Sequence, residues 1–355
     1  MKQVPRPLAS SAFGSAFKQK AKVIYPIKLS IEESIVPVSS ATMVMPRDEI
    51  FGRNYVFKLF TAAGEAGYYR IRSASVNYSN DTVTYELEHM AAEIGDWCIL
   101  QEHSGNYAAA TAIRRLWRGS DSSSTSDDSY RGEHWVLGDM TVLSGITVEL
   151  EASNRANLLT SLLDVMDGLP GIYMKFDYSE YPWTIDFSSM DFNAYQDRAH
   201  GRLSRNISSA QVSWDYTDLC TRARYLYSGT WRVYNADEDL QEKYGIVEDT
   251  ASTSGASSLA RAQYMAKEYL RKNQEPRISI QMSGQDLYAV TGITPDRLAI
   301  GKLFTLFVPE LDTTISRNIT SLKWNDVYGD PLNVDVTLGD EDPTLWAYLK
   351  KIKKK

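Results

Sequence analysis

The chain is poor in the residues that build metal and disulfide sites. Its 355 residues include two cysteines, Cys98 and Cys220, which lack the paired spacing of zinc ligands and define no disulfide framework. We expect both thiols to be buried and to pack as small apolar side chains. The histidines are scattered: His89, His103, His134 and His200. The sequence therefore predicts neither a metal centre nor a cofactor.

Long apolar runs are also missing. No stretch of about 18 consecutive apolar residues occurs, so no membrane span is expected. Residues 1–26 include basic residues but no continuous apolar segment. This argues against a secretory signal peptide and predicts synthesis and folding in a cytoplasm. The formal net charge of −7 argues against non-specific nucleic-acid binding as the main role. A sequence-specific nucleic-acid partner is not expected either.

Motifs of common enzyme classes are absent. There is no Gly-x-Ser-x-Gly nucleophile turn, no Gly-x-x-x-x-Gly-Lys phosphate loop and no zinc-binding pair of histidines around a glutamate. The dipeptides Glu88-His89 and Glu133-His134 are explained more simply as surface residues near strand ends than as metal ligands. We therefore expect no catalytic, cofactor-binding or metal-binding residues and predict that the protein is not an enzyme.

One enzymatic alternative stays open. Carboxylates crowd around Tyr181 and Trp183, and paired carboxylates beside aromatic rings are what glycoside hydrolysis needs. These carboxylates are Asp177, Glu180, Asp186 and Asp191. Solvated charges that flank a β-corner explain the same pattern more simply. The second hypothesis is thus a β-rich carbohydrate-binding or glycoside-hydrolysing protein that uses the Tyr/Trp-rich region around 173–195.

Aromatic residues, in contrast, are plentiful. The chain has 22 Tyr and 8 Trp, a composition typical of half-buried strands and contact surfaces. Between residues 22 and 88, short runs rich in Val, Ile, Tyr and Thr alternate with turn signals and predict successive strands. In the last of these runs, Val83, Tyr85 and Leu87 fall on one face. The pattern predicts antiparallel β-structure rather than βαβ units.

Three helices are expected among the strands, at 106–117, 153–167 and 259–272. Ser153 or Asn154 is the predicted cap of the second helix. Its buried stripe should consist of Leu158, Leu159, Leu162, Leu163 and Met166. Between the first two helices, the run SDSSSTSDDS at 120–129 predicts an exposed polar loop.

An internal repeat is the most informative feature of the sequence. The matched segments are 55–61 (YVFKLFT) with 302–308 (KLFTLFV), 70–76 (RIRSASV) with 318–324 (NITSLKW), and 83–87 (VTYEL) with 334–338 (VDVTL). They keep their order and nearly keep their spacing, so we expect two similar β-domains, roughly at 20–97 and 275–342, separated by inserted material. Three such chains would present six similar domains, which suits a closed cyclic ring.

Several segments, taken in order, carry a resemblance to phage proteins. They are the run from MPRDEIFGRNYVFKLFT to VTYELEH (45–89), SNRANLLTSLLDVM (153–166), YPWTIDF (181–187), RNISSAQVSWDYTDLCTRARYLYSG (205–229) and YGDPLNVDVTLGDEDPTLWAYL (328–349). Over roughly 25–348, the chain resembles the hub region of siphophage tail-associated proteins. These are baseplate hub or tail-tip proteins of the endopeptidase-tail family, and they are similar to contractile-tail hub proteins.

The resemblance implies a mainly β fold with α+β insertions: two tube-like antiparallel β-barrel domains plus smaller inserted α/β domains. The expected boundaries are 1–97 for the first tube-like domain, 98–205 for an inserted α/β domain, 206–274 for a second inserted region, 275–345 for the second tube-like domain and 346–355 for a basic tail. A C-terminal lysin module, present in longer family members, is not expected, which puts endopeptidase activity in doubt.

The resemblance also implies a function. The protein would be a structural virion component at the tail tip, made in the host bacterial cytoplasm. It would form a homotrimeric, pseudo-six-fold ring that caps or extends the tail tube and takes part in host attachment and DNA ejection. Its neighbours would be the distal tail protein ring, the tail tube and the tape measure protein. A receptor-binding or fibre protein is a further expected partner at the Lys-rich end, residues 350–355, although this end is also explained as a solubilising tail.

Overall fold

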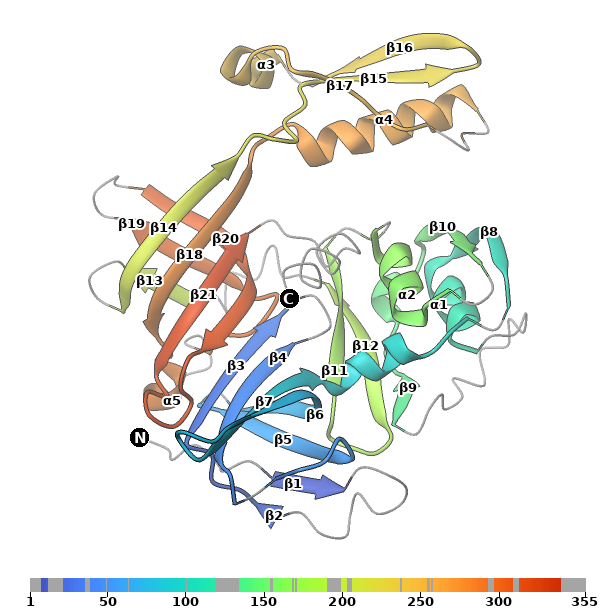
Figure 1. The fold of residues 1–355 in the computed structure, drawn as a ribbon. Coiled ribbons are helices and arrows are strands. Elements are labelled where there is room, and N and C mark those ends of the chain that lie inside the picture. Colours follow the sequence, from blue (N-terminus) through green and yellow to red (C-terminus); the bar gives the residue numbers. More distant parts are fainter. Residues whose placement is uncertain are drawn as a thin grey trace. The chain divides into compact units, whose positions relative to one another are not determined.

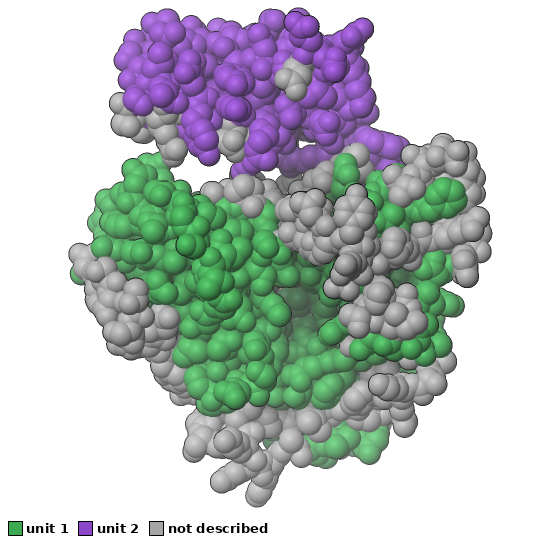
Figure 2. Space-filling view, turned by 180° about the vertical axis from the view of Figure 1, so that it is seen from behind, with its two compact units in different colours: residues 1–210, 281–355 green, residues 211–280 purple. Residues whose placement is uncertain are grey.

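The chain forms two compact units. Residues 1–210 with 281–355 belong to unit 1, and residues 211–280 to unit 2 (Figure 2). The computed structural model describes residues 8–11, 22–35, 39–48, 50–62, 64–99, 101–118, 134–153, 156–167, 169, 171–189, 199–202, 206–236, 238–253, 256, 258–292, 297–308 and 313–339. The predicted loop at 120–129 and the Lys-rich end lie outside these ranges. Within them, no helix is both long and apolar enough to cross a membrane.

Unit 1 is built on a sheet of 13 strands, coloured from blue to red along the chain in Figure 1. Its path is β14-β18-β21-β20-β3-β4-β7-β6-β5-β1-β2, and β19 pairs with both β20 and β13. The strands are β1 (Leu8–Ser11), β2 (Lys22–Val23), β3 (Lys28–Ser34), β4 (Ser40–Pro46), β5 (Tyr55–Thr61), β6 (Gly64–Asn77), β7 (Thr82–His89), β13 (Ala199–Arg202), β14 (Ile207–Asp215), β18 (Arg277–Gln285), β19 (Leu303–Val308), β20 (Thr313–Trp324) and β21 (Asn333–Gly339). A short helix, α5 (Tyr288–Thr291), follows β18.

Alternation along the strands separates an apolar face from a polar one. The predicted inward residues Val83, Tyr85 and Leu87 are each at most 2% exposed, so that prediction is confirmed. Opposite residues in adjacent antiparallel strands share a face of the sheet. Two rows of paired residues on the other face are polar: Asp335–Lys323–Glu32–Ser40–Glu88–Arg70 and Ser30–Thr42–Glu86–Ser73. The mainly β fold with α+β insertions is confirmed.

The internal repeat is confirmed by the topology of this sheet. The antiparallel meanders β5-β6-β7 and β19-β20-β21 have the same pairing. Next to β7 come β4 and β3, and next to β21 come β18 and β14. We call β3 to β7 the first half and β14 with β18 to β21 the second half. The strand β14 was not part of the predicted repeat, because residues 216–276, most of unit 2, interrupt the sequence between β14 and β18. The last residues of β14, 211–215, and the first residues of β18, 277–280, themselves belong to unit 2.

A β-bulge at the same aligned position in both halves shows how similar the two halves are. The register of β6 on β7 shifts between Ile71 and Ser73, and that of β20 on β21 shifts between Ile319 and Ser321. The sequence alignment pairs Ile71 with Ile319 and Ser73 with Ser321. Because a β-bulge is a specific local feature, its presence at the aligned position supports the alignment residue by residue.

An α/β insertion follows β7 in the chain and shares unit 1 with the large sheet. Its strands are β8 (His103–Ala108), β9 (Trp135–Leu137), β10 (Thr147–Ala152), β11 (Ile172–Asp177) and β12 (Trp183–Ser189). Its helices are α1 (Ala109–Arg118), α2 (Leu158–Asp167) and the 3₁₀ helices η2 (Met90–Asp96) and η3 (Thr141–Leu143). The pairs are β8 with β10, β11 with β12, and β12 with β9, the last of them parallel.

Two helix predictions in this insertion need correction. The helix predicted at 106–117 starts at Ala109, because Asn106–Ala108 pair with β10 as part of β8. The second helix starts at Leu158, and its cap is Asn157, whose Oδ1 accepts a hydrogen bond from the Thr160 N–H at 2.9 Å. The predicted buried stripe of this helix is confirmed, since all five side chains are at most 3% exposed.

Unit 2 is a small sheet packed on one helix. Its strands are β15 (Arg222–Tyr227), β16 (Thr230–Asn235) and β17 (Glu248–Thr250), and its helices are α3 (Glu238–Tyr244) and α4 (Leu259–Asn273). Ala262, Ala266 and Leu270 of α4 are buried against Ala223 and Tyr225 of β15. The helix predicted at 259–272 is therefore confirmed, with its apolar stripe facing the sheet.

Candidate assembly interface

The Tyr/Trp-rich region proposed as a sugar site is used for packing. Trp183 is 2% exposed, and its ring lies 4.5 Å from that of Tyr68 on β6, centroid to centroid. It also packs against Trp135 at 5.2 Å and Tyr178 at 5.4 Å. A buried indole cannot stack on a sugar in solution. This region joins the α/β insertion to the large sheet through aromatic contacts.

Two of the four carboxylates around this cluster, Asp177 and Asp186, accept hydrogen bonds from backbone N–H groups in turns. Asp177 Oδ1 accepts a hydrogen bond from the Ser179 N–H at 2.8 Å, which lowers the pKa of the Asp177 carboxyl. Asp186 Oδ1 accepts from the Asp139 N–H at 2.7 Å. Glu180 is exposed, and Asp191 lies outside the described residues. These contacts hold the corner between β11 and β12 and the loop before η3, which is a structural role.

His89 of this cluster is a buried, neutral histidine. It is 4% exposed, and burial lowers the pKa of its imidazole to about 3. Its Nδ1 accepts from the Ala91 N–H at 3.2 Å, so the proton of the neutral ring is on Nε2, which contacts the Tyr178 hydroxyl. The expectation of a surface histidine is wrong here. The neutral ring fixes the start of η2 beneath the sheet.

The other histidines and cysteines define no ligand set. His134 is 2% exposed and its Nδ1 lies 3.2 Å from the Tyr181 hydroxyl, so the surface expectation is wrong for it as well. His103 is also buried, Cys220 is buried as expected, and Cys98 is exposed, contrary to expectation. Glu133 and the side chain of His200 are outside the described part. Across the described residues, no group of three or more His, Cys, Asp or Glu side chains could hold a metal ion.

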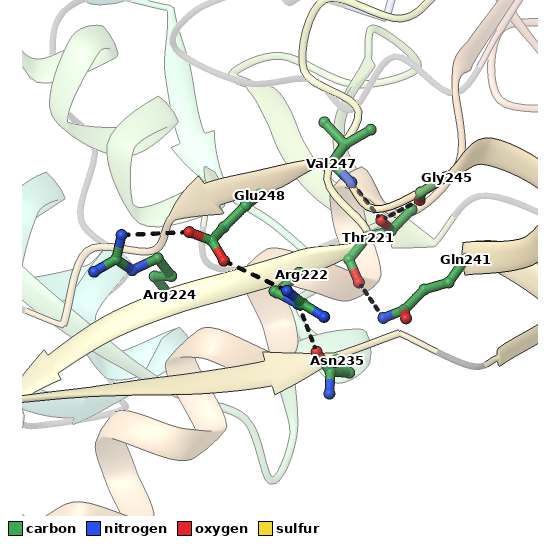
Figure 3. Close-up of polar contacts among 8 residues, drawn as sticks. All are labelled: Thr221, Arg222, Arg224, Asn235, Gln241, Gly245, Val247 and Glu248. Carbon is green, nitrogen blue, oxygen red and sulfur yellow. Dashed lines mark hydrogen bonds and ion pairs between the residues drawn. The ribbon is translucent and has the colours of Figure 1, made fainter.

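Polar contacts in unit 2 join β15 and the residue before it to residues 245–248 (Figure 3). The buried Thr221 hydroxyl donates to Gly245 O at 2.7 Å and accepts from the Val247 N–H at 2.9 Å. Glu248 lies between Arg222 and Arg224, with N···O distances of 3.9 and 3.3 Å. Since each charged group faces an opposite charge, the cluster fastens β17 to β15 and offers no free nucleophile or general base.

The contact between the two halves of the sheet is the most informative surface. Residues 321–324 of β20 pair with residues 31–34 of β3, and we call this pairing the internal junction. The Ile35 N–H donates to Thr320 O at 2.9 Å, and Ser321 Oγ donates to Glu33 O at 3.0 Å. Its apolar side chains are buried: Ile31, Leu322 and Trp324 are at most 1% exposed. The junction therefore joins one half to the other by backbone pairing and by apolar burial.

Of the two acidic residues in the internal junction, Glu32 pairs with Lys323 on the polar face and Glu33 lies on the apolar face. Glu33 stands opposite Leu322 in the strand register. Burial raises the pKa of the Glu33 carboxyl to about 7; Arg297 opposes this shift and Asp286 adds to it. The carboxyl therefore changes charge near neutral pH at the seam between the two halves.

The first half presents an edge that matches β20 but is open. Strand β5 pairs with β6 only as far as Arg70, so that residues 73–76 of β6 have β7 on one side and none of the described strands on the other. Aligned residues of β6 and β20 differ in how much of their side chains is exposed. Leu322 and Trp324 are buried, whereas their counterparts Ala74 and Val76 are exposed, Val76 to 40%. At the opposite end of the sheet, β14 has β18 as its one described neighbour.

Sequence reasoning did not identify these edges. A signal was nevertheless present in the repeat, because the alignment places Ala74 and Val76 against the much larger Leu322 and Trp324. A strand that buries large side chains in one copy of a repeat and carries small ones in the other points to different surroundings. The missing information was which strand covers each edge, since that depends on pairing between residues far apart in sequence.

Comparisons with known proteins agree with this architecture. Residues 198–348 match the family model described as prophage endopeptidase tail. No sequence among curated proteins matches the chain. Three solved structures are similar over nearly their whole lengths. The prophage tail protein gp18 from Listeria monocytogenes has a TM-score of 0.63 and 13% sequence identity, and the match covers 98% of each chain. A tail protein from Neisseria meningitidis has a TM-score of 0.65 and 14% identity, and the match covers 95% of this chain and 97% of that one. The 43 kDa tail protein of prophage MuSo2 from Shewanella oneidensis has a TM-score of 0.65 and 9% identity, and the match covers 97% of this chain and 99% of that one.

At these identities the solved structures establish the fold, and the family model adds a match in sequence. Both agree with the resemblance to phage tail proteins drawn from the sequence, which is confirmed. The chain has the fold of phage tail proteins over nearly its whole length, and its residues 198–348 match the prophage endopeptidase tail family.

Proposed function

We propose that the protein is a baseplate hub at the tail tip of a phage, assembled as a homotrimeric ring with pseudo-six-fold symmetry. The observation that carries this proposal is the duplicated half, with one strand order and one bulge position used twice in a single chain. Three chains would supply six similar halves, and such a ring mates a three-fold object with a six-fold tube.

The polar face of the sheet supports the same arrangement. Its rows contain carboxylates, hydroxyls and few cations, with Lys323 between Asp335 and Glu32 and with Glu88 bound to Arg70 at 2.8 Å. If this face lines the ring, passing DNA meets a surface that offers phosphate groups few unpaired cations. Phosphate contacts by Lys and Arg retain DNA, and a conduit that avoids them allows passage.

The proposal does not include an active site. The aromatic cluster and its carboxylates are used in packing and turns, and Trp183 is buried, which speaks against the glycoside hypothesis. A role in host attachment and DNA ejection would follow from position at the tail tip. The partners we infer are the distal tail protein ring, the tail tube, the tape measure protein and a receptor-binding or fibre protein. The four domains and the basic tail expected from the sequence belong to the same proposal.

The native mass of the purified protein tests the ring. Light scattering at micromolar concentration should give three times 40.0 kDa, and negative-stain images of the same sample should show six similar lobes around a hole. A protein that stays monomeric at every concentration and also with its neighbouring tail ring contradicts the hub. A dimer or tetramer contradicts the three-fold ring.

A further inference from the structure

The internal junction is a template for a contact that one chain cannot complete. It joins β20 of the second half to β3 of the first half. If the same contact is made from the first half, β6 takes the place of β20 and β14 takes the place of β3. Within one chain these two strands stand at separate places along the sheet path, and each has an open edge among the described strands.

The equivalence of β14 with β3 rests on matching hydrogen bonds. The Arg47 N–H donates to Asp81 O at 3.0 Å, and the Asp286 N–H donates to Leu332 O at 2.7 Å, at corresponding ends of β4 and β18. With the two halves aligned in this way, Lys28, which pairs with Val44, corresponds to Ser208, whose hydroxyl donates to Ser283 O at 2.8 Å. Residues 31–34 of the internal junction then correspond to residues 211–214 of β14.

We propose that residues 73–76 of β6 in one copy of this chain pair antiparallel with residues 211–214 of β14 in the next copy. The inference rests on the proposed ring and names the surfaces that would close it. The pairing continues the sheet from copy to copy, so that each contact between chains repeats the internal junction. The contact is head-to-tail and uses two different surfaces, which is the kind that closes into a ring.

Three properties of the edges favour a second copy as the occupant. Ala74 and Val76 are apolar and exposed, and a covering strand would bury them as β3 buries Leu322 and Trp324. The Ile35–Thr320 hydrogen bond fixes which backbone groups of β20 face β3. By alignment, the N–H groups of Ala74 and Val76 face the open edge of β6. Finally, residues 211–214 carry no formal charge, so the approach of the two strands brings no like charges together.

Substitutions at the two edges test the pairing by native mass. Ala74→Pro and Ser213→Pro each remove an N–H that the alignment points toward the missing strand, while the bonds to β7 and β18 stay in place. Val76→Lys puts a charge on the β6 edge. We expect each variant to remain folded, with an unchanged far-ultraviolet circular dichroism spectrum, and to lose the trimer. Val233→Lys on β16 is the matched control, because Val233 is 50% exposed in unit 2, and it should keep the trimer.

The outcomes separate this inference from the proposed function. A trimeric wild type whose edge variants are also trimeric overturns the β6–β14 pairing and leaves the ring standing. A monomeric wild type argues against self-assembly, and the pairing is then tested by mixing Ser75→Cys protein with Val212→Cys protein, both in a Cys98→Ser background. Their positions match a directly opposed pair of the internal junction. A mixed disulfide that forms at least ten-fold faster than with Val233→Cys protein supports the pairing, and equal rates overturn it.

Discussion

The two halves of unit 1 share their strand order and their bulge but differ in what covers the strand after the bulge. In the second half, β3 covers Leu322 and Trp324, which are at most 1% exposed. In the first half, Ala74 and Val76 occupy the same positions and face solvent. Residue size follows the surroundings: a permanent intrachain contact carries a tryptophan, and an edge open in the single chain carries small side chains. Duplicated elements can therefore be compared position by position to find surfaces used in assembly.

The largest difference between the halves is expected from truncation at the aligned positions. Trp324→Ala removes a fully buried ring from the internal junction and should lower the free energy of unfolding by about 3–5 kcal/mol. Val76→Ala, its counterpart, should change it by less than about 1 kcal/mol, because the side chain is partly exposed. Urea denaturation followed by circular dichroism measures both. Equal losses would show that the two edges are covered alike.

A second contrast is the loss of folding stability at acid pH, which we expect to arise from a residue of the first half. His89 is held neutral, and its folded pKa of about 3 lies below the ordinary value of 6.5. Stability is thus complete above pH 6.5 and declines as pH falls toward 3, by about 2 kcal/mol between pH 7 and pH 5. His89→Gln should flatten this decline in urea denaturation series at several pH values. A decline of unchanged slope in the variant would assign it to other groups.

A third contrast is the loss of folding stability at higher pH, which we expect to arise at the internal junction. The pKa of Glu33 is raised from 4.5 to about 7, so its neutral form favours the folded state. This contribution is complete below pH 4.5 and is lost as pH rises through 7. Glu33→Gln should raise the free energy of unfolding by about 1–2 kcal/mol at pH 8 and leave it unchanged at pH 4.

The matched control for this substitution is Glu32→Gln on the polar face of the same strand. It should not reproduce the gain that appears at pH 8. If both glutamine variants gain equally, the effect belongs to the net charge of the protein and not to the internal junction.

The smallest effect is expected in unit 2, which interrupts only the second half. Glu248→Gln weakens two partly exposed ion pairs, with Arg222 and Arg224, and should cost no more than about 0.5 kcal/mol. It should leave the native mass of the protein unchanged, because the surfaces proposed for assembly lie on β6 and β14. Denaturation and light scattering on the same sample check both statements. A change of mass would show that β15 or β17 also takes part in the assembly.

Much of the fold was predictable because it depends on short-range patterns of apolar and polar residues. Alternation fixed β4, β5 and β7 closely, and the apolar stripes at Leu158–Met166 and Leu259–Leu270 identified two helices. The start of α1 was missed because Asn106–Ala108 take their conformation from pairing with β10, some 40 residues further on. The burial of His89 and His134 was missed for the same reason, since a ring between two packed elements has no local signature.

The candidate interface was predictable only in part. The repeat indicated two similar β-domains and hence a ring. Which strand edges remain open depends on the pairing of β20 with β3, and that pairing joins opposite ends of the chain. No periodicity within a short window carries this information. The repeat alignment narrows the choice to a few positions, and the sheet topology selects among them.

The internal junction also sets the timing of folding. Its hydrogen bond between Ser321 and Glu33 spans 288 positions of sequence. At about 5–20 residues per second, the ribosome needs roughly 15 to 60 seconds between making these two residues. During that interval β3 lacks its β20 neighbour, and it is the strand most similar to β14. Under the proposed β6–β14 pairing, the uncovered edge of β3 offers β6 of a neighbouring nascent chain on the same messenger a wrong partner. We therefore expect rapid completion of the C-terminal strands to reduce mis-assembly.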